Sequence, residues 1–281
     1  MRDLTTLIPP LLALCQQAGQ AISDHYHAPE AHQYQSKGDD SPLTHADLAS
    51  HDILEAGLKR ITPELPILSE ESSEQDKAQR HGWPVFWMVD PLDGTKEFLA
   101  RTGEFTINIA LIDDHKPVLG VIYLPLTQQA YVGIPGQLAR VYQGPDWTYS
   151  ELLSRSLTEG EPMTVLASRR HRGPRLQSCL DWLAEHWGDS ERDNSGSALK
   201  FCQLAAGNGD FYPRYSPCCE WDTAAGQALL EAAGAVLLGL DGNPLRYNDR
   251  DTLLSPDFLA IGDPAHPLWA QLLASNVGLP Q

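Results

Sequence analysis

The stretch Val85-Phe86-Trp87-Met88-Val89-Asp90-Pro91-Leu92-Asp93-Gly94-Thr95 decides how the rest of the chain is interpreted. Its first five residues form a continuous apolar run, which is typical of a buried strand. Pro91 has no backbone N–H and disfavours the α region for Asp90, so the backbone is expected to leave the strand there. Two carboxylates and the Leu92 carbonyl would then lie at the strand's end and could face a cation.

The Gly94-Thr95 pair adds a second kind of site. Gly94 permits unusual backbone angles, and Thr95 can begin a helix whose free N–H groups attract an anion. The alternative is an Asx-type turn, in which Asp93-Gly94 only reverses the chain and Asp90 caps a helix. Because the acids directly follow a buried strand, the order of residues favours a joint site for metal and phosphate.

Composition limits the function classes. The 281 residues are 42% hydrophobic, enough for one large domain or two moderate ones. The formal charge of −17 argues against a nucleic-acid polymer as partner, because such polymers are bound through Lys and Arg. An anionic substrate would need divalent metal ions to reverse the unfavourable local field.

The cysteines and apolar stretches indicate the compartment. Five cysteines without a C-x-x-C pair suit a reducing cytoplasm, and Cys218-Cys219 is interpreted as two small buried thiols rather than a redox or metal-binding pair. The apolar start of the chain is too short for a signal peptide. Residues 228–240 fall short of the roughly 20 apolar residues of a membrane-spanning helix, so no transmembrane segment is expected.

Two helices are expected before the central stretch, from Pro9 to about Tyr26 and from Thr44 to about Ile61, with a loop or short hairpin over 34–42 between them. Thr44-x-x-Asp47 matches a capping box. Asp47 could therefore serve only the helix start, or it could also position a water molecule, and the residues alone leave both roles open.

A short strand over 66–69 ends at Glu70-Glu71, and the charged residues 72–80 that follow are expected to be mobile. If this strand lies beside Val85–Val89, Glu70 comes close to Asp90; a solvated acidic loop is the alternative. Alternating apolar residues then predict an antiparallel meander over 105–134. The polar residues 143–161 contain the expected boundary between domains 1–155 and 156–281.

The second half combines small residues with isolated charges. A strand over 164–168 precedes four arginines within 169–175, which form either a phosphate-attracting rim or a solvated loop. Lys200 precedes a helix that ends near 207 and is either a site residue or an ordinary surface lysine. Asp222 begins a helix that runs to Ala233, and capping alone would explain it. No dinucleotide, Walker or G-x-S-x-G motif is present.

Glu70, Asp90–Thr95 and the helix start Trp221–Gly226 occur in an order and form similar to the inositol monophosphatase superfamily, a group of magnesium-dependent, lithium-sensitive phosphatases. The similarity spans most of the chain. Further stretches resemble the 3′(2′),5′-bisphosphate nucleotidase branch of that superfamily: Ser36-Lys37 through Asp47, Leu68–Glu71, Asp90–Phe98, Leu199–Cys202 and Tyr212–Arg214. Ala100 departs from the family pattern, which usually has a polar or basic residue there.

The resemblance implies a layered α/β/α/β/α sandwich with an N-terminal antiparallel sheet, helices and a smaller C-terminal α/β half. It implies about two or three Mg²⁺ ions per site. The implied metal ligands are Glu70, Asp90, the Leu92 carbonyl, Asp93 and Asp222. Asp47 and Thr95 correspond to the pair that orients the attacking water. The implied substrate contacts are Gly94, Thr95, Ser168, His171, Gly196, Lys200 and Arg214.

The expected function is a Mg²⁺-dependent phosphatase of sulfur assimilation that converts adenosine 3′,5′-bisphosphate, and by extension its sulfated analogue, to AMP and phosphate. The expected protein is a monomer or homodimer in the cytoplasm, with the inner face of the cell membrane as an alternative location. An inositol- or sugar-phosphate phosphatase is the nearest alternative. A non-catalytic Mg²⁺-binding regulator is disfavoured because it would not need Asp47 and Thr95.

Overall fold

A seven-stranded sheet forms the first half of the chain in the computed structural model, which describes residues 3–29, 34–36, 42–168, 173–275 and 277–278. Its strand order is β3-β4-β5-β6-β7-β8-β9, in which only β3 and β4 are parallel. The strands are β3 Ile67–Ser69, β4 Val85–Asp93, β5 Thr106–Asp113, β6 Lys116–Leu124, β7 Gln129–Ile134, β8 Leu138–Gln143 and β9 Thr148–Glu151. The predicted meander is confirmed.

The second half builds a mixed five-stranded sheet with the order β11-β10-β12-β14-β13. Its strands are β10 Met163–Ala167, β11 Ser190–Asn194, β12 Phe211–Arg214, β13 Val236–Gly239 and β14 Phe258–Ile261. A separate short pair joins β1 Gln35–Ser36 to β2 Pro42–Leu43, as the expected hairpin would.

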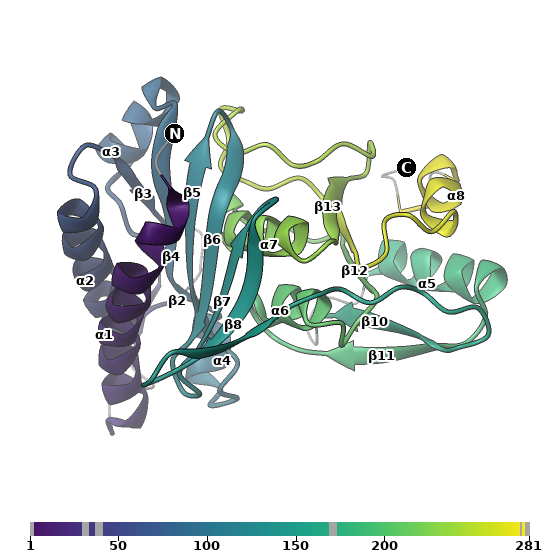
Figure 1. The fold of residues 1–281 in the computed structure, drawn as a ribbon, viewed down its shortest axis with the longest axis horizontal. Helices are drawn as coiled ribbons and strands as arrows, with labels where there is room; N and C mark the ends of the chain where they lie inside the picture. The colour runs from purple at the N-terminus through teal and green to yellow at the C-terminus, as the bar shows by residue number, and fades with distance from the viewer. Residues whose placement is uncertain (1–2, 30–33, 37–41, 169–172, 276, 279–281) are drawn as a thin grey trace.

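Helices cover both sheets and separate them, as Figure 1 shows. The first layer is α1 and α2, the layer between the sheets is α6 and α7, and the last is α5 and α8. The helices are η1 Leu4–Leu7, α1 Ile8–His27, α2 His45–Ile61, α3 Glu74–Gln79, η2 Arg80–Gly82, α4 Thr95–Leu99, α5 Pro174–His186, α6 Leu199–Ala205, α7 Glu220–Ala232 and α8 Leu268–Ala274. This arrangement confirms the predicted layered α/β/α/β/α class.

The apolar run of β4 serves two cores at once, which explains why it does not alternate with polar residues. Trp87 and Val89 pack in the core beneath α1 and α2, whereas Phe86 and Met88 pack in the core beneath α6 and α7. Successive side chains of a strand point to opposite faces, so a strand between two helical layers is apolar throughout.

Helix α7 lies directly against the seven-stranded sheet, and two glycines make this approach possible. A Cβ atom at Gly120 would lie 2.3 Å from the Ala225 carbonyl oxygen, and one at Gly133 would lie 2.4 Å from the Cα of Leu229. Any larger residue would push the helix away. The start of α7, which carries Asp222, is thereby placed at a fixed height over the sheet.

Several expectations need correction. β4 does not end at Asp90 but continues to Asp93, with a shift in its pairing to β5 between these residues. The charged segment 72–80 contains α3, which Ser73 caps, and β9 lies within the region expected to be only polar and turn-rich. The change of sheet falls between Glu151 and Met163, yet α7 packs on the first sheet, so the division into 1–155 and 156–281 stays a prediction.

Candidate active site

Three carboxylates, two from β4 and one from the start of α7, meet at the end of β4. Asp90, Asp93 and Asp222 each place one oxygen so that all three atoms lie within 4.8 Å of one another. Glu70 follows the neighbouring strand β3, and its backbone N–H donates to the Val89 carbonyl at 3.0 Å. The parallel pairing of β3 with β4 is therefore what brings Glu70 beside Asp90, as the sequence predicts.

The backbone around Asp90 explains how the carboxylates come together. The Leu92 N–H donates to Asp90 Oδ1 at 3.0 Å, which holds the irregular end of β4. Gly94 follows with a φ of 92°, and a Cβ atom there would lie 3.0 Å from the Glu104 carbonyl oxygen. Only glycine adopts this turn without strain.

Burial and mutual repulsion raise the pKa values of two carboxylates in the cluster. Burial, together with the charges of Glu70, Asp93 and Asp222, raises the pKa of Asp90 well above its ordinary value. Burial and the charge of Asp93 raise the pKa of Asp222 to about 7, against the lowering effect of Arg214. Buried carboxylates of this kind are stabilised by a shared cation. Carboxylate and carbonyl oxygens are the ligands that a hard divalent ion prefers, so the residues present fit such an ion.

Asp222 both caps α7 and faces the cluster. Its Oδ2 accepts the backbone N–H of Cys219 at 3.0 Å, which completes a capping box. A carboxylate has several lone-pair positions and can serve both purposes. Capping is therefore present but does not account for the position of Asp222 beside Asp90 and Asp93.

Asp47 likewise serves two purposes, because it caps α2 and also contacts Thr95. Asp47 is 1% exposed, and its Oδ2 accepts the Thr44 N–H at 2.8 Å within the predicted capping box. Its Oδ1 lies 3.2 Å from the Thr95 hydroxyl, which also lies 3.3 Å from the Leu92 carbonyl oxygen. The cap and the contact with Thr95 coexist, so the two roles considered for Asp47 do not exclude each other.

The sequence did not predict a hydrogen-bond network around Asp93. Ser197 Oγ lies 2.6 Å from Asp93 Oδ2 and 2.7 Å from Thr106 Oγ1, and Asn108 Nδ2 donates to Asp93 at 3.3 Å. Thr106 and Asn108 are buried polar residues in an apolar strand, which was the available signal. Ser197 reaches this network from the second half with a positive φ of 50°.

A pocket of 240 Å³ opens beside the cluster. Asp93 and Asp222 line one side of it, and cationic side chains also reach its wall in this strongly acidic protein. Its lining includes Lys96, Ser168, Gly196, Ser197, Lys200 and Arg214. Acidic and basic groups on one small pocket suit a phosphorylated ligand bound together with metal ions.

Lys200 is not the ordinary surface lysine that was one of its two interpretations. Its side chain is 2% exposed, and Nζ donates to the carbonyl oxygens of Ser195 at 3.0 Å and Ser197 at 2.7 Å. Burial and the nearby Arg214 lower the pKa of Lys200 to about 8. Lys200 thus both lines the pocket and supports the loop that carries Ser197.

Of the other basic residues expected at the site, one lines the pocket and one does not. Arg214 lines the pocket, with its guanidinium held by the carbonyl oxygens of Ser216 and Pro217. Arg175, from the expected arginine rim, instead pairs with Asp257 at 2.7 Å. The remaining rim residues and His171, an expected substrate contact, lie outside the described residues.

The cysteines agree with their interpretation in part. All five are free thiols; four are buried and Cys219 is half-buried. Within the described part of the chain, no helix combines the length and apolar character needed to cross a membrane.

Comparison with known proteins places this chain in a family. The model of the inositol monophosphatase family matches residues 3–277, so the chain belongs to that family. It is 40% identical over 252 residues to the 3′(2′),5′-bisphosphate nucleotidase CysQ of Escherichia coli strain K12, covering 90% of this chain and 98% of that protein. The CysQ protein of Aggregatibacter actinomycetemcomitans is 32% identical over 277 residues, covering 98% of this chain and all of that protein.

Solved structures agree with this placement. CysQ from Bacteroides thetaiotaomicron, a bacterial member of the inositol monophosphatase family, is 36% identical with a TM-score of 0.77, covering 90% of this chain and 97% of that one. An inositol monophosphatase from Zymomonas mobilis is 22% identical with a TM-score of 0.75, covering 98% of this chain and 99% of that one, and shares the fold.

Proposed function

We propose that this protein is a Mg²⁺-dependent 3′(2′),5′-bisphosphate nucleotidase that releases the 3′-phosphate of adenosine 3′,5′-bisphosphate to give AMP. The sulfated analogue is a further expected substrate. The observation that carries the proposal is the cluster of buried Asp90 with half-buried Asp93 and Asp222, at the edge of a pocket that Lys200 and Arg214 also line. Similarity to nucleotidases named CysQ over most of the chain supports this substrate class.

Five groups are proposed to hold the metal: the carboxylates of Glu70, Asp90, Asp93 and Asp222, and the Leu92 carbonyl. These hard oxygens suit about two or three Mg²⁺ ions. When bound, such ions would neutralise charge on the phosphoryl group and lower the pKa of the attacking water. The carboxylates must be ionised for this purpose, although burial and mutual repulsion raise the pKa values of Asp90 and Asp222. Metal binding would therefore release protons from these carboxyl groups.

Asp47 and Thr95 would direct the nucleophilic water. When the Thr95 hydroxyl donates to Asp47 Oδ1, 3.2 Å away, its oxygen is left as an acceptor for a proton of that water. The capping box holds Asp47 through its other oxygen, so the carboxylate cannot rotate freely. This arrangement fixes which side of the phosphate the water approaches.

The second phosphate is proposed to lie on the basic side of the pocket. Lys200 and Arg214 are both anchored by backbone carbonyl oxygens, and no carboxylate among the described residues is hydrogen-bonded to either of them. An inositol or sugar monophosphate has no group that needs two such charges. The same pocket could still admit these smaller esters, so they form the alternative substrate class.

Phosphate release from a panel of substrates tests the proposal. The panel contains adenosine 3′,5′-bisphosphate, its sulfated analogue, inositol 1-phosphate and fructose 1,6-bisphosphate, each with Mg²⁺ and with excess chelator. The expected result is the highest kcat/KM for the adenosine bisphosphate and no release under chelation. A higher kcat/KM for inositol 1-phosphate would overturn the substrate assignment.

Thr95→Val should lower kcat by about 100-fold, because it removes the hydroxyl that orients the water while keeping the shape of the side chain. Thr95→Ser is the matched control and should stay within several-fold of wild type. Initial rates at saturating substrate and Mg²⁺ give both values. Wild-type kcat in Thr95→Val would exclude the proposed role of this hydroxyl.

A further inference from the structure

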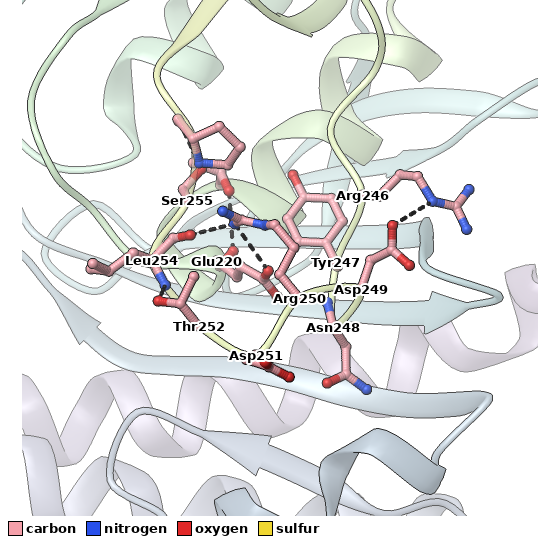
Figure 2. A network of polar contacts seen from close by, with 12 residues as sticks. Glu220, Arg246, Tyr247, Asn248, Asp249, Arg250, Asp251, Thr252, Leu254 and Ser255 are labelled. Carbon is pink, nitrogen blue, oxygen red and sulfur yellow. Dashed lines mark hydrogen bonds and ion pairs between the residues drawn. The ribbon is translucent and has the colours of Figure 1, made fainter.

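A loop between β13 and β14 lies across the start of α7, and we refer to residues 245–255 of it as the strap (Figure 2). The Glu220 N–H donates to the Leu253 carbonyl at 2.8 Å, and the Ser255 N–H donates to the Cys218 carbonyl at 2.8 Å. The strap therefore pairs with the backbone on both sides of Cys219. It holds the residues that lead directly to Asp222.

The Glu220 carboxylate binds the strap through a hydrogen bond and an ion pair. It is 1% exposed and accepts the backbone N–H of Asn248 at 2.7 Å. Arg250 reaches between Glu220, at 3.4 Å, and the Leu254 carbonyl oxygen, as Figure 2 shows. A buried carboxylate is costly unless it is hydrogen-bonded and paired, and here both conditions are met.

Arg80 holds the strap from the opposite half of the chain. It is 3% exposed, and its Nη1 donates to Asn248 Oδ1 at 2.6 Å and to the Arg250 carbonyl at 3.0 Å. Its Nη2 donates to the Asp251 carbonyl, and Asn248 Nδ2 donates back to the Arg80 carbonyl at 2.7 Å. Asn248 is thus bound by Arg80 through its side chain and by Glu220 through its backbone.

This network joins two segments that each carry a proposed metal ligand. Residues 70–80 begin at Glu70, which is bonded to Val89, and end at Arg80. Midway along the segment, Lys77 Nζ lies 5.6 Å from the ring centre of Trp221. The residues Glu220, Trp221 and Asp222 are consecutive at the start of α7. Contacts at Arg80 and Lys77 therefore tie the segment after Glu70 to the helix turn that presents Asp222.

We propose that Arg80, Asn248 and Glu220 are positioning residues that hold Glu70 and Asp222 at the separation required by a divalent cation. This inference rests on the proposed metal-dependent function. Replacing a buried ion pair by apolar residues of similar volume is often neutral or stabilising, so burial of these charges is by itself weak evidence for a purely stabilising role. Altering a group that is hydrogen-bonded to a metal ligand typically changes metal affinity by about 10–100-fold, and we expect residues that fix the backbone next to the ligands to act in the same direction.

Arg80→Gln and Asn248→Ala test the inference. Each should raise the Mg²⁺ concentration for half-maximal phosphate release by about tenfold or more, while kcat at saturating Mg²⁺ stays within several-fold of wild type. Calorimetric titration of Mg²⁺ without substrate should show the same loss of affinity. Asn248→Ala leaves the two carbonyl acceptors of Arg80 in place and is the milder variant if Arg80→Gln folds poorly.

Arg155→Gln is the control, because it likewise removes an arginine that links two segments, here through hydrogen bonds of 2.6 and 2.5 Å to Asp210. It should lower Tm without changing the Mg²⁺ requirement. Wild-type Mg²⁺ affinity in both Arg80→Gln and Asn248→Ala would overturn the inference and leave the proposed function intact. A wild-type protein that binds no Mg²⁺ and needs none would overturn both.

Discussion

Asp90→Asn is expected to lower the rate of phosphate release by on the order of 10³-fold at saturating Mg²⁺. Asp90 is the most deeply placed carboxylate of the cluster, and its charge is the one that bound ions would share. In the wild type, burial raises the pKa of Asp90, and so does repulsion by the charges of Glu70, Asp93 and Asp222. The substitution removes this repulsion. Metal-free Asp90→Asn should therefore have a Tm at least as high as metal-free wild type.

Asp113→Asn provides the comparison for this variant. Asp113 lies at the far end of β5, is exposed, and pairs with Val85 at the opposite end of β4 from the cluster. It should retain wild-type kcat/KM. Full Mg²⁺-dependent activity in Asp90→Asn, measured by initial rates of phosphate release, would remove Asp90 from the metal site.

Metal-free protein is expected to lose stability as the pH rises from about 4 to about 7. Asp222 has an ordinary pKa of 3.8 but about 7 in the folded protein, and the pKa of Asp90 is raised in the same direction. In this interval the folded state binds more protons than the unfolded state, so the free energy of unfolding falls as pH rises. A Tm decrease on the order of 10 °C corresponds to a shift of this size.

Two comparisons isolate the cause. Asp222→Asn should remove much of the pH dependence of the metal-free Tm, because an amide does not titrate. Added Mg²⁺ should reverse the trend and stabilise the wild type increasingly as pH rises, since only ionised carboxylates bind it. Scanning calorimetry with chelator and with Mg²⁺ measures both effects; a metal-free Tm that rises between pH 5 and 7 would contradict this account of the cluster.

The part of the site that lies at the end of β4 could be predicted because local chemistry determines it. The apolar run before Asp90, the proline after it and the glycine at position 94 each restrict the backbone in a way that is visible in the residues themselves. Glu70 followed by inference from one assumption, that its short strand lies beside β4, and the parallel pair confirms that assumption. The predicted end of β4 was wrong because the strand continues past Pro91 with a shift in its pairing to β5 between Asp90 and Asp93.

Other parts could not be predicted because their partners are distant in the chain. Arg80 and Asn248 are 168 residues apart, and neither belongs to a periodic pattern. Ser197 reaches Asp93 across 104 residues, from a position with a positive φ, and no sequence pattern links the two residues. The strand β9 has four exposed residues and so lacks the alternation by which half-buried strands are found.

Crystals soaked with Mn²⁺ in place of Mg²⁺ offer the most direct test of the central claim, that this cluster is a catalytic metal site. We expect anomalous difference peaks at the end of β4, beside the carboxylate of Asp90. Glu70, Asp93 and Asp222 should supply the remaining carboxylate ligands. Well-diffracting crystals with no peak at these residues, or with peaks only elsewhere on the protein, would contradict the account.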